Sequence, residues 1–210
     1  MRIIPYPNGI YGATTYLVYD EVSLDAFLID STSSINEISD FVKTNKLNLK
    51  YVLITHGHFD HVYCLNEIKN KFPSSLVFIN KNDLPLLNQV EMQCEMAQVE
   101  QIKVPCVDGL LDENTKNLKL GEAEIKIIET PGHSQGGVCY LIGNNLFSGD
   151  TLFFESIGRC DLFGGSIRDI EKSIKEKLYK LPDETVVHPG HGDSTTIGHE
   201  KKYNEYIKEV

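Results

Sequence analysis

The length, composition and charge of this chain exclude several classes of protein. Its 210 residues, 41% hydrophobic and 24% charged, have the size and composition of one folded domain and not of a disordered or fibrous protein. Thirty acidic and 20 basic residues leave a formal charge of −10, whereas a nucleic-acid-binding protein needs basic residues for its phosphate contacts. No apolar run approaches the ~18 residues of a membrane span. We therefore expect neither nucleic acid nor a membrane as a partner.

The first residues and the cysteines indicate the compartment of the protein. The opening segment, MRIIPYPNGIYG, lacks the apolar core of a signal peptide. The five cysteines, an odd number at scattered positions, do not make a disulfide framework. We therefore expect a cytoplasmic protein with free thiols.

The predicted elements alternate between strands and helices along the chain. Strands are expected where β-branched and other apolar residues gather, at Tyr11–Tyr19, Leu24–Ile29, Tyr51–Ile54, Leu76–Ile79, Ala123–Ile128, Val138–Ile142, Leu146–Ser148 and Thr185–Val187. Helices are expected from Ile35 onwards and at His61–Phe72, Ile167–Leu181 and His199–Ile207, with residues 81–100 helical or irregular. Ser34 with Glu37, and Ser166 with Asp169, are predicted to cap two of these helices. The alternation predicts a layered α/β fold in which helices cover sheets.

The densest group of chemically active side chains lies in residues 55–61, THGHFDH. Neutral imidazole and carboxylate are ligands that divalent zinc, iron and manganese accept. His56 and His58 alternate along an extended chain and so point the same way, while Asp60 and His61 can turn toward a second point. A polar surface loop is the alternative, but nothing else about this segment requires four such residues. The spacing therefore predicts a metal site.

Three later segments repeat the order of a short strand, a glycine-containing turn and a metal-ligating side chain. The strand ends lead into His133 through TPG, into Asp150 through SG, and into His191 through HPG. Glycine permits a sharp turn, and sites in α/β proteins form just beyond strand ends. The remaining histidines are expected to support the packing, in the case of His188, or to lie at the surface, in the case of His199.

Sorted by position, the candidate ligands give two sites with one residue shared. We expect metal 1 to be held by His56, His58 and His133, metal 2 by Asp60, His61 and His191, and both by a bridging Asp150. Paired ions of this kind lie about 3.5–4 Å apart and lower the pKa of a bound water toward about 7, which supplies metal-bound hydroxide. The expected cofactors are two divalent ions, Zn²⁺ by preference, with Fe and Mn as alternatives.

These residues resemble the metallo-β-lactamase superfamily, and further motifs resemble its glyoxalase II-like hydrolases. The motifs are TPGHSQGGV from Thr130, LFSGDTLF from Leu146, IGRCD from Ile157 and HPGHGDSTTIG from His188. The resemblance implies an αββα sandwich of two mixed sheets flanked by helices, with the metals at one sheet edge. It is greatest to the short bacterial branch, so we expect one domain over residues 1–210 without the helical domain that binds glutathione in longer relatives.

The resemblance also implies an activity, the hydrolysis of thioesters such as S-D-lactoylglutathione. A thiol leaves as a thiolate with a pKa near about 8.5, so little protonation of the leaving group is needed, and Asp60 or Asp150 remains to relay a proton. Relatives use a basic residue against glutathione where this chain has Arg159. We expect Arg159 either to clamp a substrate carboxylate or to pair with Asp161. The bulky pair Tyr63-Cys64 is expected to narrow the pocket beside metal 2.

Other functions fit the pattern less well. A mononuclear-iron persulfide dioxygenase of the same superfamily shares the segment 56–61, but that branch does not complete the second metal site, as His191 does here. A β-lactamase would normally carry an export signal, and a nuclease of the superfamily would have a basic face. A metal-binding or scaffold protein on a retained fold would usually have lost some of the seven predicted ligands. The dioxygenase is therefore the main alternative to a thioester hydrolase.

Overall fold

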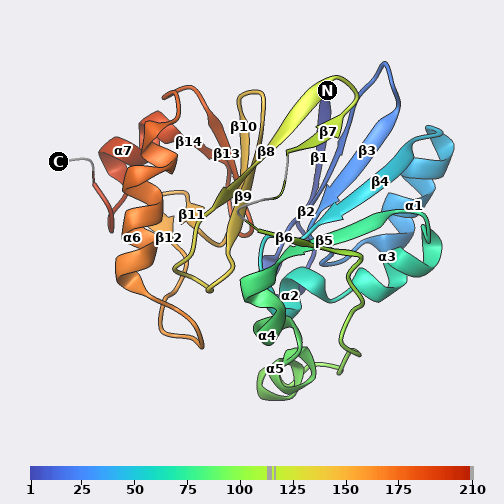
Figure 1. The fold of residues 1–210 in the computed structure, drawn as a ribbon, viewed down its shortest axis with the longest axis horizontal. Coiled ribbons are helices and arrows are strands. Elements are labelled where there is room, and N and C mark those ends of the chain that lie inside the picture. Colours follow the sequence, from blue (N-terminus) through green and yellow to red (C-terminus); the bar gives the residue numbers. More distant parts are fainter. Residues whose placement is uncertain (113–114, 116, 209–210) are drawn as a thin grey trace.

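Two six-stranded sheets form the centre of the molecule (Figure 1), which this computed structural model describes for residues 1–112, 115 and 117–208. The first sheet runs in sequence order through β1 (Arg2–Tyr6), β2 (Thr15–Tyr19), β3 (Asp25–Ile29), β4 (Asn48–Leu53), β5 (Leu76–Asn80) and β6 (Gly109–Leu111). Its first three strands pair antiparallel, and β3 to β6 pair parallel.

The second sheet is also mixed. Its order is β14 (Thr195–Thr196), β13 (Val186–Pro189), β10 (Asn145–Gly149), β9 (Val138–Ile142), β8 (Ala123–Glu129) and β7 (Leu118–Leu120). β10 and β13 pair parallel, and the other neighbours pair antiparallel. A short hairpin of β11 (Leu152–Phe153) and β12 (Ser156–Ile157) follows β10.

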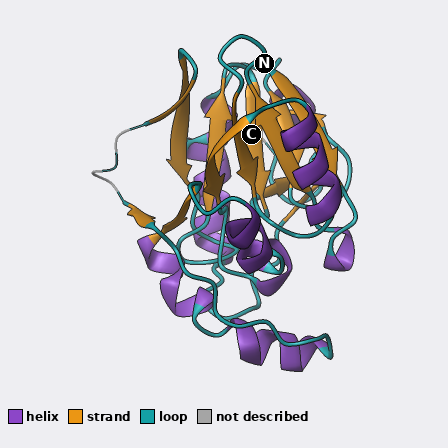
Figure 2. Ribbon diagram, turned by 90° about the vertical axis from the view of Figure 1, so that its right-hand side faces the viewer, coloured by secondary structure: helices purple, strands orange, loops and turns teal. Residues whose placement is uncertain are grey.

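Helices cover the outer faces of both sheets. They are α1 (Ile35–Thr44), α2 (Phe59–Val62), α3 (Leu65–Lys71), α4 (Leu84–Leu87), α5 (Val90–Ala97), α6 (Ile167–Glu176) and α7 (Ile197–Tyr203), with 3-10 turns η1 (Ile10–Gly12), η2 (Lys81–Asp83) and η3 (Leu178–Lys180). In Figure 1, α1 and α3 lie beside the first sheet, α6 and α7 beside the second, and α2, α4 and α5 toward the lower ends of the strands. Figure 2, turned by 90°, shows helices beneath the lower ends of the strands. Within the described ranges, no helix is long and apolar enough to cross a membrane.

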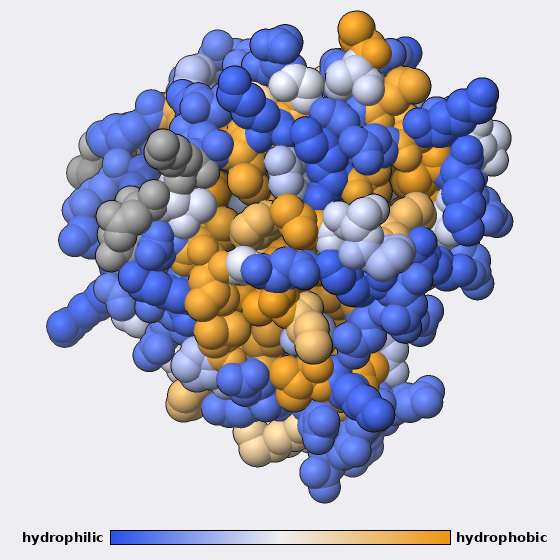
Figure 3. Space-filling view, turned by 45° about the vertical axis from the view of Figure 1, so that its right-hand side comes forward, coloured by the Kyte–Doolittle hydropathy of each residue, from blue (hydrophilic) through white to orange (hydrophobic). Residues whose placement is uncertain are grey.

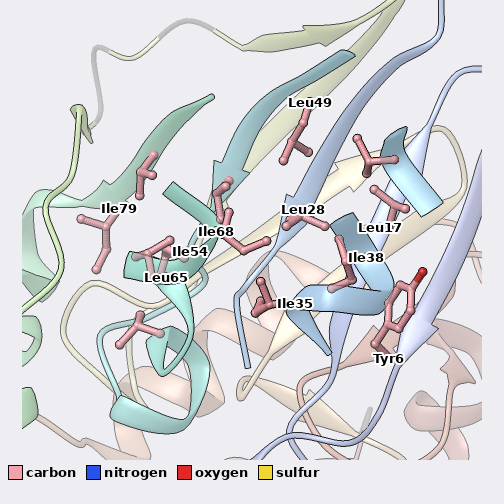
Figure 4. Close-up of a cluster of buried hydrophobic side chains, with 14 of the residues drawn as sticks. Tyr6, Leu17, Leu28, Ile35, Ile38, Leu49, Ile54, Leu65, Ile68 and Ile79 are labelled. Carbon is pink, nitrogen blue, oxygen red and sulfur yellow. The ribbon is translucent and has the colours of Figure 1, made fainter. Parts of the chain in front are cut away.

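Three hydrophobic layers join these four structural layers. Along β3, Leu28 packs into the layer under α1 and α3, whereas Phe27 and Ile29 pack between the two sheets, because successive side chains of a strand point to opposite faces. A third layer lies between the second sheet and α6, η3 and α7. Figure 4 shows the first layer, in which strand residues such as Leu28 face helix residues such as Ile38. The predicted αββα sandwich is confirmed.

The structure corrects the predicted start of α1. Ser34 has φ 59° and ψ 27°, a left-handed conformation, and its side chain makes no capping hydrogen bond. An N-cap residue needs an extended backbone for its oxygen to reach the N–H groups of the first turn, so the predicted capping box with Glu37 is wrong. The predicted cap of α6 is confirmed, because the Ser166 side chain accepts from the backbone N–H of Asp169.

Several predicted boundaries change as well. The helix predicted at 61–72 is two helices, α2 and α3, with a break at Tyr63-Cys64. The helix predicted at 167–181 ends at Glu176 and is followed by η3. The strand predicted from Tyr11 begins at Thr15, since Tyr11 adopts φ 56° within η1. The sequence also does not predict β1, which contains Pro5 at a sheet edge, or the very short strands β6, β11, β12 and β14.

Candidate metal centre

The predicted ligands follow the ends of four strands and meet beside α2. β4 leads into His56 and His58, β8 into His133, β10 into Asp150 and β13 into His191, while Asp60 and His61 belong to α2 itself. Glycine makes the closest of these approaches possible, because a Cβ atom at Gly190 would collide with Asp150 and His61. The strand-end arrangement predicted from the sequence is therefore present.

The ligand atoms form three overlapping groups, and within each group the atoms lie no more than 4.8 Å apart. The groups are His56, His58 and His133; Asp60, His61 and His191; and His56, His61 and Asp150. The first two match the two predicted metal sites, and we call them the first and the second group. The third contains one histidine from each of them, so the two groups adjoin and Asp150 lies with both.

Asp150 occupies the position between the two groups. Its Oδ1 lies 3.3 Å from Nε2 of His61, and its Oδ2 lies 3.6 Å from Nε2 of His133 and 3.5 Å from Nε2 of His191. His133 belongs to the first group, whereas His61 and His191 belong to the second. One carboxylate thus reaches ligands of both, which is the geometry that a bridging residue requires.

Hydrogen bonds outside the centre decide which ring nitrogen faces inward. Nδ1 of His133 donates to the carbonyl oxygen of Arg159 at 2.7 Å, and Nδ1 of His191 donates to that of Tyr11 at 3.2 Å. A neutral imidazole has one N–H, so Nε2 of each ring keeps a lone pair for an ion. His58 instead turns its Nδ1 toward the centre, where this atom lies 2.8 Å from Nε2 of His133. Two ring nitrogens of the first group therefore face a common point.

A buried aspartate that the sequence analysis did not single out, Asp30, orients one ligand of each group. Its Oδ2 accepts from Nδ1 of His61 at 2.7 Å and from the Thr55 hydroxyl at 2.8 Å. Since the hydroxyl proton is used there, the Thr55 oxygen accepts from Nδ1 of His56 at 3.0 Å, and Nε2 of His56 stays free. Asp30 directly follows β3 without the glycine-containing turn that precedes the other strand-end ligands, so that pattern does not identify it.

Two atoms of the centre are buried without a hydrogen-bond partner. They are Nε2 of His56 and Oδ1 of Asp150. Such atoms are rare, because leaving a buried polar group unpaired costs about 1–3 kcal/mol. A nitrogen lone pair and a carboxylate oxygen are also the donors that a divalent cation takes. The residues present therefore fit a pair of metal ions.

The two groups differ in their charge. Burial lowers the pKa of His56 well below its usual range and that of His58 to about 4. Burial would lower the pKa of His61 too, but neighbouring carboxylates, Asp150 foremost, raise it well above its usual range. For Asp150 itself burial favours a higher pKa, yet His61 and the other histidines lower it well below its usual range. In the first group burial thus favours the neutral form of His56 and His58, whereas in the second the carboxylates favour the charged form of His61.

A second buried aspartate, Asp83, joins the loops that carry the first group. Its Oδ2 accepts from the backbone N–H of Gly57 at 2.9 Å and from the Ser134 hydroxyl at 2.8 Å, and its Oδ1 accepts from the N–H of Gly136 at 2.6 Å. It lies 26 residues from Gly57 and 51 from Ser134 along the chain. No local pattern in the sequence identifies such a residue.

The structure separates the remaining predicted site residues. Arg159 forms the predicted pair with Asp161 through two hydrogen bonds of 2.8 Å each, and this pairing lowers the pKa of Asp161 to about 2. Arg159 also lines a cavity over the centre. Tyr63 and Cys64 line a different cavity, because the break between α2 and α3 places them away from the centre. The predicted narrowing by these two residues is therefore wrong.

The last two histidines lie outside the groups. His188 stacks on Phe147 with ring centroids 5.1 Å apart, which confirms its packing role. His199 is half-buried at the surface, where it stacks on Phe154 and its Nε2 lies 2.9 Å from a carboxylate oxygen of Glu155.

An αββα sandwich with adjoining His and Asp clusters at its strand ends defines a metal-binding protein of the metallo-β-lactamase type. Residues 9–191 match the model of the metallo-beta-lactamase superfamily, and the chain belongs to this superfamily. Its members are generally metal-dependent hydrolases.

Curated proteins similar to this chain extend over nearly its whole length. The uncharacterized protein ML0493 of Mycobacterium leprae is 34% identical and covers 99% of both chains. The probable metallo-hydrolase YqgX of Bacillus subtilis is 32% identical over 96% of this chain and 95% of its own. The hydroxyacylglutathione hydrolase GloC of Haemophilus influenzae is 31% identical over 99% of this chain and 98% of its own.

Solved structures show the same coverage. BLEG-1 B3 metallo-beta-lactamase has a TM-score of 0.90 at 31% identity, covering 99% of this chain and 100% of that one. A di-iron-bound form of TTHA1623 has a TM-score of 0.86 at 32% identity, covering 97% and 100%. ETHE1 from Myxococcus xanthus has a TM-score of 0.78 at 25% identity, covering 99% and 84%. The same fold thus occurs in a B3 metallo-beta-lactamase, in TTHA1623 and in ETHE1.

Proposed function

We propose that this protein hydrolyses thioesters with the help of two divalent ions. The observation that carries the proposal is the complete second group, Asp60, His61 and His191, next to the first, with Asp150 within reach of both. Similarity to GloC of Haemophilus influenzae, a hydroxyacylglutathione hydrolase, supports thioesters as the class of substrate.

Each group of ligands has one ion to hold in this proposal. His56, His58 and His133 would hold the first ion and Asp60, His61 and His191 the second, with Asp150 available to both. Bound ions of this kind supply Lewis acidity, which lowers the pKa of water and polarises a carbonyl group. Zn²⁺ suits the imidazole and carboxylate donors, and iron is the alternative because the similar protein TTHA1623 has a di-iron-bound form.

The residues of the chain orient the ligands and take up a proton. Asp30 and the carbonyl oxygens of Tyr11 and Arg159 keep the ligand nitrogens turned inward. Water adds to the thioester carbonyl carbon, the C–S bond breaks, and the sulfur leaves as a thiolate, while Asp60 or Asp150 accepts a proton from the water. Because an ordinary thiol has a pKa of about 8.5, no general acid is needed at the sulfur. The products are a carboxylic acid and a free thiol.

Arg159 is the proposed contact for a substrate carboxylate. It lines the cavity over the centre, and its guanidinium already holds the Asp161 carboxylate in a two-bonded arrangement. A substrate carboxylate has the same shape as the Asp161 group and can replace it.

The test combines metal analysis with a panel of substrates. We expect about two ions per chain in the purified protein, and release of a free thiol from S-D-lactoylglutathione or another thioester in the panel. About one iron per chain, together with oxygen uptake on glutathione persulfide and no thioester hydrolysis, would overturn the proposal in favour of a persulfide dioxygenase.

A further inference from the structure

A cavity of about 620 Å³ opens over the candidate metal centre. Its lining includes the ligands His58, Asp150 and His191, so a molecule inside it can place a reacting carbonyl group beside the ions. The volume lies within the range of about 300–1,000 Å³ that is typical of small-molecule sites. The side chains around the ligands therefore select the substrate.

The walls of this cavity are largely apolar and come from separate parts of the chain. On one side Tyr11 packs edge-on against Phe59, with ring centroids 5.8 Å apart. Met92 and Met96 of α5 form a second wall. The hairpin β11–β12 and the loop after it supply a third wall through Phe153, Ile157, Leu162 and Phe163. We call these side chains the apolar wall.

Several members of the apolar wall are open to solvent. Met96 is 77% exposed, Tyr11 68% and Phe163 62%. A patch of large apolar side chains exposed to solvent is typical of a binding surface, and the flexible methionine side chain adapts to ligands of different shape. Two of the three methionines of the chain belong to this wall. Figure 3 shows hydrophobic residues gathered over the middle and lower part of one face, toward the end where α4 and α5 lie in Figure 1.

The same cavity offers little to a carrier with several negative charges. Among the described residues that line it, Arg159 has the one permanent positive charge, and Asp161 already neutralises it. The amide group of Gln93 is also used, since it accepts from the backbone N–H of Phe59 and donates to the carbonyl oxygen of Leu86. Glutathione carries two carboxylates and a nucleotide carrier several phosphate charges, whereas Arg159 is the one permanent side-chain cation among the described lining residues.

We infer that the preferred substrates are thioesters of extended apolar acyl groups on a carrier with at most one carboxylate. The acyl chain lies against the apolar wall, with its carbonyl group beside the metal ligands and its sulfur toward the carrier. Burial of the chain supplies the binding free energy, which grows with each methylene until the cavity is full. This inference names the substrate class of the proposed thioester hydrolase and rests on that function.

The test is a series of acyl thioesters on one neutral carrier, N-acetylcysteamine, from acetyl to decanoyl. We expect kcat/KM to rise by about fourfold per added methylene until a plateau, and the octanoyl thioester to exceed S-D-lactoylglutathione. Hydrolysis that does not depend on acyl length, or that is fastest with S-D-lactoylglutathione, would overturn the inference but leave the hydrolase intact. No hydrolysis of any thioester by the metal-loaded protein would instead contradict the proposed function.

Met96→Ser tests the apolar wall directly, with Val22→Ser as the matched control. Both side chains are strongly exposed, at 77% and 93%, so neither change threatens folding, and Val22 lies outside the cavity. We expect Met96→Ser to lower kcat/KM for the octanoyl thioester about fivefold more than for the acetyl thioester, and Val22→Ser to affect the two equally. If Met96→Ser spares the octanoyl substrate but splits a dimer in light scattering, the wall is instead an interface between copies of this chain and the inference is wrong.

Discussion

The two ligand groups of the centre hold equal numbers of side chains but differ in charge and exposure. The first consists of imidazoles, and burial keeps the pKa of His56 and His58 low. The second includes the Asp60 carboxylate. Burial would lower the pKa of His191, yet its hydrogen bond with Asp60 and the nearby Asp150 raise it. The His191 side chain of the second group is 23% exposed, whereas that of His133 in the first group is 6% exposed.

From this difference we infer that the two proposed ions are not equivalent. Burial favours the neutral form of His56 and His58, so these two rings present their lone pairs without releasing a proton. In the second group the neighbouring carboxylates raise the pKa of His61 and His191, so protons compete with an ion for these rings and binding there depends on pH. We therefore expect the first ion to be the more persistent and the second to be the more easily lost.

Removing the Asp150 carboxylate, which lies within reach of both groups, should affect both metal positions and have the largest effect. Asp150→Ala is expected to lower the metal content at both positions and to reduce kcat/KM by about 10³-fold or more, because it takes a donor from each ion. Metal analysis and thiol release measure the two results together. Asp40→Ala, at an exposed aspartate on α1, is the control, and full activity in Asp150→Ala would disprove the bridging role.

Removing a ligand of the second group alone should separate the two ions. His191→Ala is expected to leave about one ion per chain and to lower kcat/KM by about 10²-fold, since the second ion loses one of its donors while the first keeps all of its imidazoles. Mass spectrometry of the intact protein and elemental analysis count the ions. His199→Ala should retain both ions, because His199 lies outside the groups. Two ions in His191→Ala would show that the ligands are paired differently.

Lowering the pH should remove the second ion before the first. The pKa values of His61 and His191 are raised, so protons compete with the ion at these rings as the pH falls below neutral. Burial lowers the pKa of His58 to about 4 and that of His56 well below its usual range, so these rings stay free of protons over the same pH range. Dialysis at stepwise lower pH, followed by elemental analysis, should show a plateau near one ion per chain. Simultaneous loss of both ions would contradict this ordering.

Weakening the hydrogen bonds of Asp83, which join the two loops that carry the first group, should have a milder effect than removing a ligand. Asp83→Asn places an amide NH₂ against one of the three donors that Asp83 now accepts from. We expect the free energy of unfolding to fall by about 1–3 kcal/mol and the affinity for the first ion to fall about tenfold. Denaturant titration and competition with a chelator measure these effects. Ser134→Ala removes one of the three bonds and should have a smaller effect, so an equal loss in both variants would argue against the tie.

The smallest expected effect concerns Arg159, which touches neither group through its side chain. Arg159→Ala should raise KM about threefold for a thioester that carries a carboxylate and leave KM for a neutral thioester nearly constant. Its backbone carbonyl still accepts from His133, so the metal content should not change. Initial rates on the two substrates decide the matter, and equal changes in KM would remove Arg159 from substrate binding.

Local patterns predicted most of the fold, and the failures have physical causes. The apolar strands and helices repeat at spacings that depend only on neighbouring residues, and the Ser166 cap depends on a residue three positions away. Ser34 fits the same capping pattern but fails, because its left-handed backbone does not let its side chain cap the helix, and the pattern of residue types does not encode that conformation. Strands of two or three residues carry too little periodicity to be recognised.

The sequence by itself determined which side chains are the candidate ligands of the centre, because each lies in a recognisable local pattern. Four of them fall within residues 56–61, and the rest follow strand ends through glycine turns. Only the tertiary structure decided what lies around them. Asp83 meets its partners across 26 and 51 residues of chain, and the cavity walls join residues as distant as Tyr11, Met96 and Phe163. Such contacts arise from the packing of two sheets and their loops, which no local pattern encodes, and they set how the ions are held and what is bound.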